Sequence, residues 1–314
     1  MQKKPEIDKQ QTKRLKIILV ILVALFLSVM LVLFVFAARV FFDVKATTEE
    51  MYQPIERKTS IDKLSKGDKK AFSVLLLGID TGALGRTEQG RSDTILVAIV
   101  DPKKDETVLL SLPRDTYTEI VGYGEMDKLN HAYAFGGPAM AMATVEQLLN
   151  IPINYYVSIN MEGIESLVDE VGGVQVANRR AFTYDGTEFP VGLQQLKGAD
   201  ALKYVRMRYD DPEGDYGRQA RQRQLIQAMT KQILSIDGLM DYQAILSCMK
   251  DNVSTNMTFN EMRIVLANYR SAFQKIEAVQ LQGEDFMENN ISYQRIPAEE
   301  LTEAQKYLKE RLDQ

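Results

Sequence analysis

Two carboxylates and one guanidinium stand at the ends of three short apolar stretches. Asp80 follows FSVLLLGI, Asp93 precedes TILVAIV, and Arg114 comes shortly after VLLSL. Carboxylate oxygens are preferred ligands of hard cations such as Mg²⁺, with Mn²⁺ as a second candidate. Taken singly, each charge could simply solvate the end of a strand. A metal site therefore requires that Asp80 and Asp93 converge.

A second group of charges is the arginine-rich stretch 204–224, YVRMRYDDPEGDYGRQARQRQ. Its arginines are Arg206, Arg208, Arg218, Arg221 and Arg223. Arginine suits phosphate because its planar guanidinium donates two parallel hydrogen bonds and stays charged. The acidic residues expected to hold these guanidiniums in place are Asp210, Asp211 and Asp215. The alternative is a surface patch of ion pairs.

The arrangement along the chain limits which of these arginines can bind one ligand. Arg206 and Arg208 are two residues apart and would diverge on a helix, so the helix before them should end near Met207. Arg218 and Gln222 are four residues apart, on one face at the start of a predicted helix, where free N–H groups favour anions.

The same helical face becomes apolar further on, with Leu225 and Met229. A polar head above an apolar stripe matches a pyrophosphate attached to a long lipid. It matches an ordinary amphipathic core helix as well.

The 314 residues include one histidine, His131, and one cysteine, Cys248. This composition excludes an internal disulfide and any metal site that needs several histidines or thiolates. A histidine base could only be His131. No neighbour in the sequence would activate Cys248, which we interpret as a buried small hydrophobic residue.

Three predicted strands bring the first group of charges together. The strands cover 72–79, 94–100 and 108–112. Their connections are short enough for antiparallel neighbours. The end of the first strand, the start of the second and the end of the third then share one edge of the sheet. Asp80, Asp93 and Arg114 are expected at this edge, beside Arg91 and Asp115.

Helices and strands alternate over the remaining sequence. Predicted helices cover 138–150, 164–171, 198–204, 217–235, 259–268 and 298–311, and further strands cover 155–159, 174–176 and 278–281. This interleaving predicts an α/β fold, a three-layer αβα sandwich with a central mixed sheet.

One N-terminal transmembrane helix is expected before this fold, at Ile17–Ala38, because these residues carry no charge and can span about 30 Å as a helix. The basic residues before it predict a cytoplasmic N-terminus and an extracytoplasmic remainder. A cleaved signal peptide is the alternative, but its apolar region would be shorter. Residues 17–314 carry a formal net charge of about −9, which argues against nucleic acid as a partner.

The predicted organisation therefore has four parts. These are a cytoplasmic tail (1–16), the transmembrane helix (17–38), an extracytoplasmic stalk (39–70) and a catalytic domain (71–314). The stalk should have some helical character near 47–52. Within the domain, a motif core covers 72–234 and a C-terminal helical part covers 235–314.

Seven motifs in this order resemble the LytR-CpsA-Psr family of cell-wall proteins. They are LLLGID, GRSDTILV, LSLPRDTY, DKLNHAYAFGG, LVDEVGGVQV, LKGADALKYVRMR and GDYGRQARQ. The likeness covers roughly 72–234. Tyr209 departs from it, because many members have histidine after the R-x-R pair.

The resemblance implies a membrane-anchored phosphotransferase at the cell wall. Such proteins transfer an anionic glycopolymer, for example a teichoic acid or a capsule polysaccharide, from polyprenyl pyrophosphate to a sugar hydroxyl of peptidoglycan. By resemblance, Asp80 and Asp93 bind Mg²⁺ at the pyrophosphate. The residues implied to hold phosphate oxygens are Arg114, Arg206, Arg208, Arg218 and Gln222, to which we add Arg91 from its place beside Asp80.

Three questions stay open at this level. The general base is expected to be Asp93, then Asp80, with His131 as a weaker candidate. A polyprenyl-pyrophosphate hydrolase would use the same residues with water as the acceptor. A lipid-binding membrane regulator of transcription is the third possibility, although a tail of about 16 residues is too short for a DNA-binding fold.

Overall fold

The computed structural model describes residues 9–56, 63–65, 67–80, 90–233 and 242–313. Residues 81–89, in the connection between the first two predicted strands, lie outside the described residues. The chain divides into two compact units, residues 1–46 and 47–314.

The first unit contains most of helix α1 (Lys9–Met51). Within α1, the segment Lys16–Met51 is long and apolar enough to cross a membrane. Its apolar side chains are exposed on all sides, and the hydroxyl of Ser28 donates to the carbonyl of Leu25 in the same helix. The predicted span, 17–38, lies inside α1, which is a candidate single-pass membrane anchor.

α1 continues without a break into the predicted stalk. Its last turn belongs to the second unit, where Thr48 and Met51 are buried and Tyr52 forms a bridge to Thr255. The start of the stalk is therefore helical, and its residues from Thr48 contribute to the core of the second unit.

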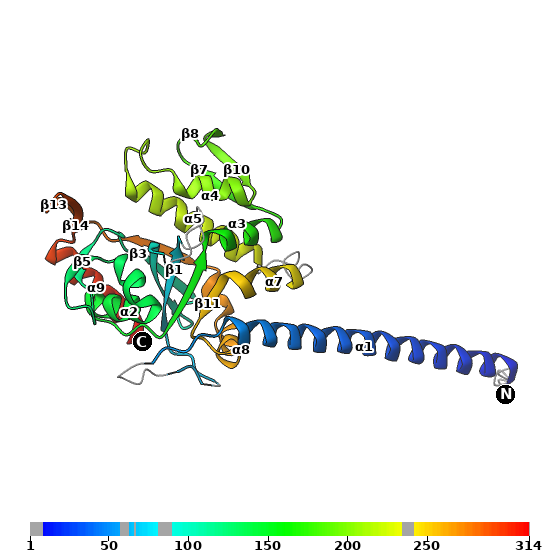
Figure 1. Ribbon diagram of the computed structural model, residues 1–314. Coiled ribbons are helices and arrows are strands. Elements are labelled where there is room, and N and C mark those ends of the chain that lie inside the picture. Colours follow the sequence, from blue (N-terminus) through cyan, green and yellow to red (C-terminus); the bar gives the residue numbers. More distant parts are fainter. Residues whose placement is uncertain (1–8, 57–62, 66, 81–89, 234–241, 314) are drawn as a thin grey trace, which may run out of the picture. The chain divides into compact units, whose positions relative to one another are not determined.

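The second unit is built on a six-stranded sheet with the order β11-β6-β1-β2-β3-β12 (Figure 1). In this order the strands are Val253–Thr255, Tyr155–Asn160, Phe72–Ile79, Ser92–Asp101, Glu106–Ser111 and Ile276–Gln280. β2 is antiparallel to β1 and β3, whereas β6 is parallel to β1 and β12 is parallel to β3. The sheet is mixed, as predicted.

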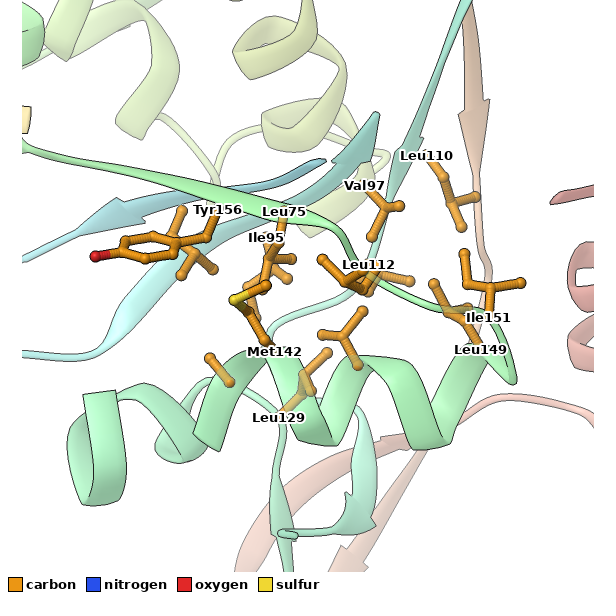
Figure 2. Packing of buried hydrophobic residues seen from close by; sticks show 14 of the residues in the cluster. Leu75, Ile95, Val97, Leu110, Leu112, Leu129, Met142, Leu149, Ile151 and Tyr156 are labelled. Carbon is orange, nitrogen blue, oxygen red and sulfur yellow. The ribbon is translucent and has the colours of Figure 1, made fainter. Parts of the chain in front are cut away.

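Both faces of the sheet are buried because its central strands alternate apolar side chains between two cores. Leu75 and Leu77 of β1 pack with α2 (His131–Leu149) and α9 (Ala298–Leu312). Figure 2 shows Leu75 in one cluster with Met142 and Leu149 of α2. Phe72 and Val74 point the other way and pack with the segment formed by α8 (Phe259–Asn268) and η2 (Arg270–Phe273). This confirms the three-layer αβα arrangement.

A third core lies beyond the sheet, at the top of Figure 1. It is formed by α3 (Met161–Glu170), α4 (Gly198–Arg206), α5 (Asp215–Ile233), α7 (Tyr242–Asn252), β7 (Val174–Asn178), β8 (Phe182–Tyr184), β9 (Thr187–Phe189) and β10 (Gly192–Leu196). The α5 helix borders both this core and the sheet, so it has two buried faces.

The C-terminal part was predicted to be mainly helical, and this was incomplete. It supplies both edge strands of the sheet. Of these, β12 corresponds to the strand predicted at 278–281, whereas β11 was not predicted, and neither was the hairpin of β13 (Glu284–Glu288) and β14 (Ile291–Arg295). A second unpredicted hairpin joins β4 (Tyr117–Glu119) and β5 (Met126–Lys128). Such short, half-exposed strands lack a long alternating pattern, which is why the sequence did not indicate them.

Candidate active site

The structure brings the two predicted acidic residues to one pocket. Asp80 follows β1, Asp93 lies near the start of β2, and both line the same cavity. The strands come close here because Gly78 lies opposite Thr94. A Cβ at Gly78 would be 2.9 Å from the Cβ of Thr94. Glycine therefore permits the approach of the two strand ends.

Arg114 joins this edge from the segment that follows β3. Its Nη1 lies 2.8 Å from Oδ1 of Asp93, and its Nε lies 3.6 Å from Oδ2 of Asp115. Burial by itself would lower the pKa of Arg114, but the charges of Asp93 and Asp115 outweigh it and raise the pKa. The guanidinium therefore stays charged beside the acidic pair.

Asp215 organises the arginines of the 204–224 stretch. As the first residue of α5, it places Oδ1 2.6 Å from Nη2 of Arg218 and 3.5 Å from Nε of Arg208. Nη2 of Arg218 also donates to the backbone carbonyl of Asp93, at 3.5 Å. These contacts connect the arginine group to the acidic pair through α5.

Burial lowers the pKa of Arg218, and the neighbouring charges of Arg114 and Arg208 lower it further, against the opposing effect of Asp215. The Nε of Arg218 is buried without a hydrogen-bond partner among the described residues. Arg114, Arg208 and Arg218 therefore lie close enough to affect one another, and Arg218 keeps a buried N–H donor that an anionic ligand could use.

The cavity itself measures about 400 Å³ and lies between the sheet and helices α3, α4 and α5. Its apolar lining is Leu76, Leu77, Gly78, Leu96, Val157, Ile159, Met161, Ile164, Val205, Leu225, Ile226 and Met229. Its polar lining is Asp80, Asp93, Thr94, Tyr184, Arg206, Arg218 and Gln222. The predicted polar head and apolar stripe of α5 thus line one and the same pocket.

The positions of the other predicted phosphate-binding arginines differ from one another. α4 ends at Arg206, as the R-x-R argument required, and Arg208 lies beside Asp215. The side chain of Arg91 is exposed, and its backbone N–H donates to Oδ1 of Asp80 at 2.6 Å.

Two arginines of the predicted cluster serve the fold instead. Arg221 is buried, lies 2.6 Å from Asp211, and donates to the backbone carbonyl of Tyr204. Arg223 is buried and donates to the Ser111 hydroxyl at 2.6 Å. Arg223, five residues after Arg218, lies on another face of α5. Arg221, three residues after Arg218, reaches Asp211 and Tyr204 and does not line the pocket. Of the three predicted acidic partners, Asp215 and Asp211 hold guanidiniums and Asp210 is exposed.

Sequence reasoning missed Asn130. It precedes α2, donates from Nδ2 to Oδ1 of Asp93 at 3.4 Å, and its backbone N–H donates to the carbonyl of Arg114. Its place within the DKLNHAYAFGG motif was the available signal. The next residue, His131, lies with Nδ1 2.7 Å from Oδ2 of Asp127.

Cys248 is half-buried rather than fully buried, and burial raises the pKa of its thiol to about 11. A thiol with a raised pKa is a poor nucleophile, in agreement with a packing role. Among the described residues, no group of three or more His, Cys, Asp or Glu side chains could hold a metal ion.

Several known proteins are similar to this chain in sequence and in fold. The TagU polyisoprenyl-teichoic acid–peptidoglycan teichoic acid transferase of Enterococcus faecalis is 49% identical over 294 residues, which cover 92% of this chain and 97% of the relative. The crystal structure of B. subtilis TagU has a TM-score of 0.64 and 39% identity, over 78% of this chain and 98% of that one. A structure of TagT bound to LIIa-WTA has a TM-score of 0.66 and 30% identity, over 83% and 97% of the two chains.

The family description LytR_cpsA_psr matches residues 39–310. This range covers the sheet, the acidic pair, the arginine group and the pocket. The chain therefore belongs to the LytR-CpsA-Psr family.

Proposed function

We propose that this protein is a membrane-anchored phosphotransferase that moves a teichoic acid from polyprenyl pyrophosphate to a sugar hydroxyl of peptidoglycan. One observation carries the proposal: a single pocket has apolar walls and a polar lining that includes Asp80, Asp93, Arg206 and Arg218. A pyrophosphate joined to a lipid needs both surfaces. The named activity of the Enterococcus faecalis relative supports this choice of polymer and acceptor.

The reaction forms a bond between the acceptor oxygen and the phosphorus that carries the polymer. It breaks the bridging P–O bond of the pyrophosphate, so polyprenyl phosphate leaves. Phosphoryl transfer is catalysed mainly by positioning and charge neutralisation. Arg206, Arg208 and Arg218, with the amide of Gln222, would hold the phosphate oxygens. Leu225 and Met229 would contact the lipid.

Asp80 and Asp93 fit Mg²⁺ by their donor chemistry, with Mn²⁺ as an alternative. In phosphoryl-transfer sites Mg²⁺ is often held by one or two carboxylates and takes its other ligands from phosphates and water. Two carboxylates lining the pocket match that mode, in which substrate completes the site. When bound, the ion would neutralise charge on the pyrophosphate.

We propose Asp93 as the base that accepts the proton of the acceptor hydroxyl, and Asp80 as the second candidate. Oδ1 of Asp93 is engaged by Arg114 and Asn130. Among the contacts with described residues, this leaves Oδ2 as the oxygen for a proton or a metal ion. Arg114 would then orient the carboxylate as well as contribute positive charge.

The proposed orientation places the N-terminus in the cytoplasm and residues 47–314 outside. The basic tail before the apolar segment of α1 supports this orientation. Lipid-linked polymer and peptidoglycan would both be within reach of the domain on that side of the membrane.

The Arg206→Ala variant tests the phosphate role. Arg206 is exposed although it lines the pocket, so its removal should leave the fold intact. We expect transfer from lipid-linked polymer to peptidoglycan to fall roughly 100-fold, as for loss of one donor to a transition-state oxygen. Arg179→Ala, which removes an exposed arginine beside β7, is the matched control.

The reaction products distinguish a transferase from a hydrolase. Normal transfer by the folded Arg206→Ala protein would contradict the proposed site. Release of free polymer phosphate at the same rate with and without peptidoglycan would instead identify a hydrolase.

A further inference from the structure

A stacked pair of aromatic side chains lies on the surface near the candidate active site, and the function proposed above does not use it. Tyr123 is 51% exposed and Phe135 is 43% exposed. Their ring centroids are 4.4 Å apart and the rings are inclined by 25°. Aromatic rings gain free energy from burial, so an exposed pair offers a contact surface to a ligand with an apolar face.

The backbone holds this pair in place from two sides. Tyr123 lies in the turn between β4 and β5, and Phe135 ends the first turn of α2. Gly136 and Gly137 then break the helix, because Gly137 has a φ of +62° and both glycines depart from helical angles. The break separates the turn that carries Phe135 from the long part of α2, which packs on the sheet.

A short path joins the pair to the acidic edge of the sheet. Asn130 bonds to Asp93, and the ring of the next residue, His131, lies 5.6 Å from that of Phe135. On the other side, Lys128 forms an ion pair of 2.8 Å with Asp115. The strands of the hairpin rise about 3.3 Å per residue, so its turn lies on the order of 10 Å from this ion pair.

The surroundings of the pair are acidic. Glu119, Glu125 and Asp127 lie on the hairpin, and the segments 116–127 and 129–140 contain no lysine or arginine. A polyanion such as the donor polymer would be repelled here, whereas the arginines gather at the pocket. An uncharged ligand is favoured by this distribution.

We propose that Tyr123 and Phe135 form a stacking platform for the neutral sugar rings of the acceptor glycan strand. The apolar face of a pyranose ring packs on the exposed aromatic rings. His131, held by Asp127 through Nδ1, can offer Nε2 to a sugar hydroxyl at the inner edge of the platform. This inference rests on the proposed function, since it names the binding surface for the acceptor.

Fluorescence can test the platform without any turnover. The chain contains no tryptophan, so Tyr123→Trp in the full-length protein keeps an aromatic ring and introduces a single fluorophore. We expect a saturable blue shift with an uncharged oligomer of N-acetylglucosamine and no shift with soluble teichoic acid. A shift with teichoic acid alone, or no shift with either probe, would overturn the platform.

Kinetics give the second measurement. Tyr123→Ala and Phe135→Ala should each raise the KM for peptidoglycan about tenfold and leave the KM for the lipid-linked donor unchanged. Leu266→Ala is the control, because Leu266 is also exposed but lies on α8. If transfer proceeds and neither variant changes the KM for peptidoglycan, the platform is wrong while the transferase function stands. If no transfer occurs, the fluorescence titration still decides on the platform.

Discussion

At the residue scale, the candidate site depends on buried charges that are only partly compensated. The side chains of Asp215 and Arg218 are 7% and 8% exposed, and the pair lies at the start of α5. Forming such a pair contributes little to stability because both charges lose water. Removing one partner leaves the other charge buried and uncompensated. The same carboxylate also restrains Arg208, so it affects two of the guanidiniums proposed to bind phosphate.

We therefore expect Asp215→Asn to lower the free energy of unfolding by about 3 kcal/mol. It should also weaken pyrophosphate binding, because Arg208 and Arg218 lose the carboxylate that positions them. Urea unfolding and calorimetric titration with inorganic pyrophosphate measure the two effects. Glu213→Gln changes an exposed residue two positions before Asp215. It should alter neither the free energy of unfolding nor the affinity for pyrophosphate. Unchanged pyrophosphate affinity in a folded Asp215→Asn protein would remove Asp215 from the positioning residues.

At the element scale, the connection between α4 and α5 decides where the arginines lie. Arg221 of α5 donates to the carbonyls of Tyr204 and Met207 and pairs with Asp211, and its guanidinium lies 5.3 Å from the ring of Phe182. These contacts tie the start and the middle of the connection to one side chain. The connection in turn carries Arg208 to Asp215.

The Asp211–Arg221 pair predicts a dependence of stability on pH. Burial alone would raise the pKa of Asp211, but the hydrogen bond and charge of Arg221 outweigh it and lower the pKa. A carboxylate with a lowered pKa stabilises the fold at pH values above its ordinary pKa of 3.8, and this contribution disappears as the pH falls through the lowered value.

Asp211→Asn should therefore cost about 3 kcal/mol of unfolding free energy at pH 7, where it leaves Arg221 buried without its partner. The difference from the unsubstituted protein should shrink as the pH falls from 3.8 through the lowered pKa, because Asp211 is protonated first in the unfolded chain and then in the folded protein, where the ion pair is lost. Denaturant unfolding across this pH range provides the measurement. Asp210→Asn, one residue away and exposed, is the control. A difference independent of pH would show that the ion pair is not its cause.

At the scale of the whole molecule, the proposed chemistry requires residues 47–314 to lie on the side of the membrane where peptidoglycan is found. The apolar segment of α1 is compatible with either orientation, and the basic tail favours a cytoplasmic N-terminus.

Cysteine labelling in intact cells can measure the orientation. In a Cys248→Ala background, Tyr209→Cys places a thiol at a position that is 92% exposed. A membrane-impermeant maleimide should label it in intact cells, whereas Gln2→Cys should be labelled only after permeabilisation. The reverse pattern would exclude transfer to peptidoglycan by this domain.

The sequence by itself determined the features that depend on residues close together in the chain. A charge-free run of apolar residues predicts a membrane helix because of its length, and the strands at 72–79 and 108–112 follow from short apolar runs between turns. Short connections made the antiparallel order predictable. That order brings Asp80, Asp93 and Arg114 to one edge of the sheet. In antiparallel neighbours, the end of one strand lies beside the start of the next.

Only the tertiary structure decided which side chains at that edge belong to one site. Arg218 and Arg221 look alike in the sequence, but α5 is covered on two faces, and only Arg218 lines the pocket. Asn130 and the stacked pair of Tyr123 and Phe135 depend on a hairpin too short to leave a pattern. Local periodicity of apolar residues determines which segments form helices and strands. Packing between residues far apart in the chain decides what each face of a helix or strand contacts, and no short stretch of sequence encodes that packing.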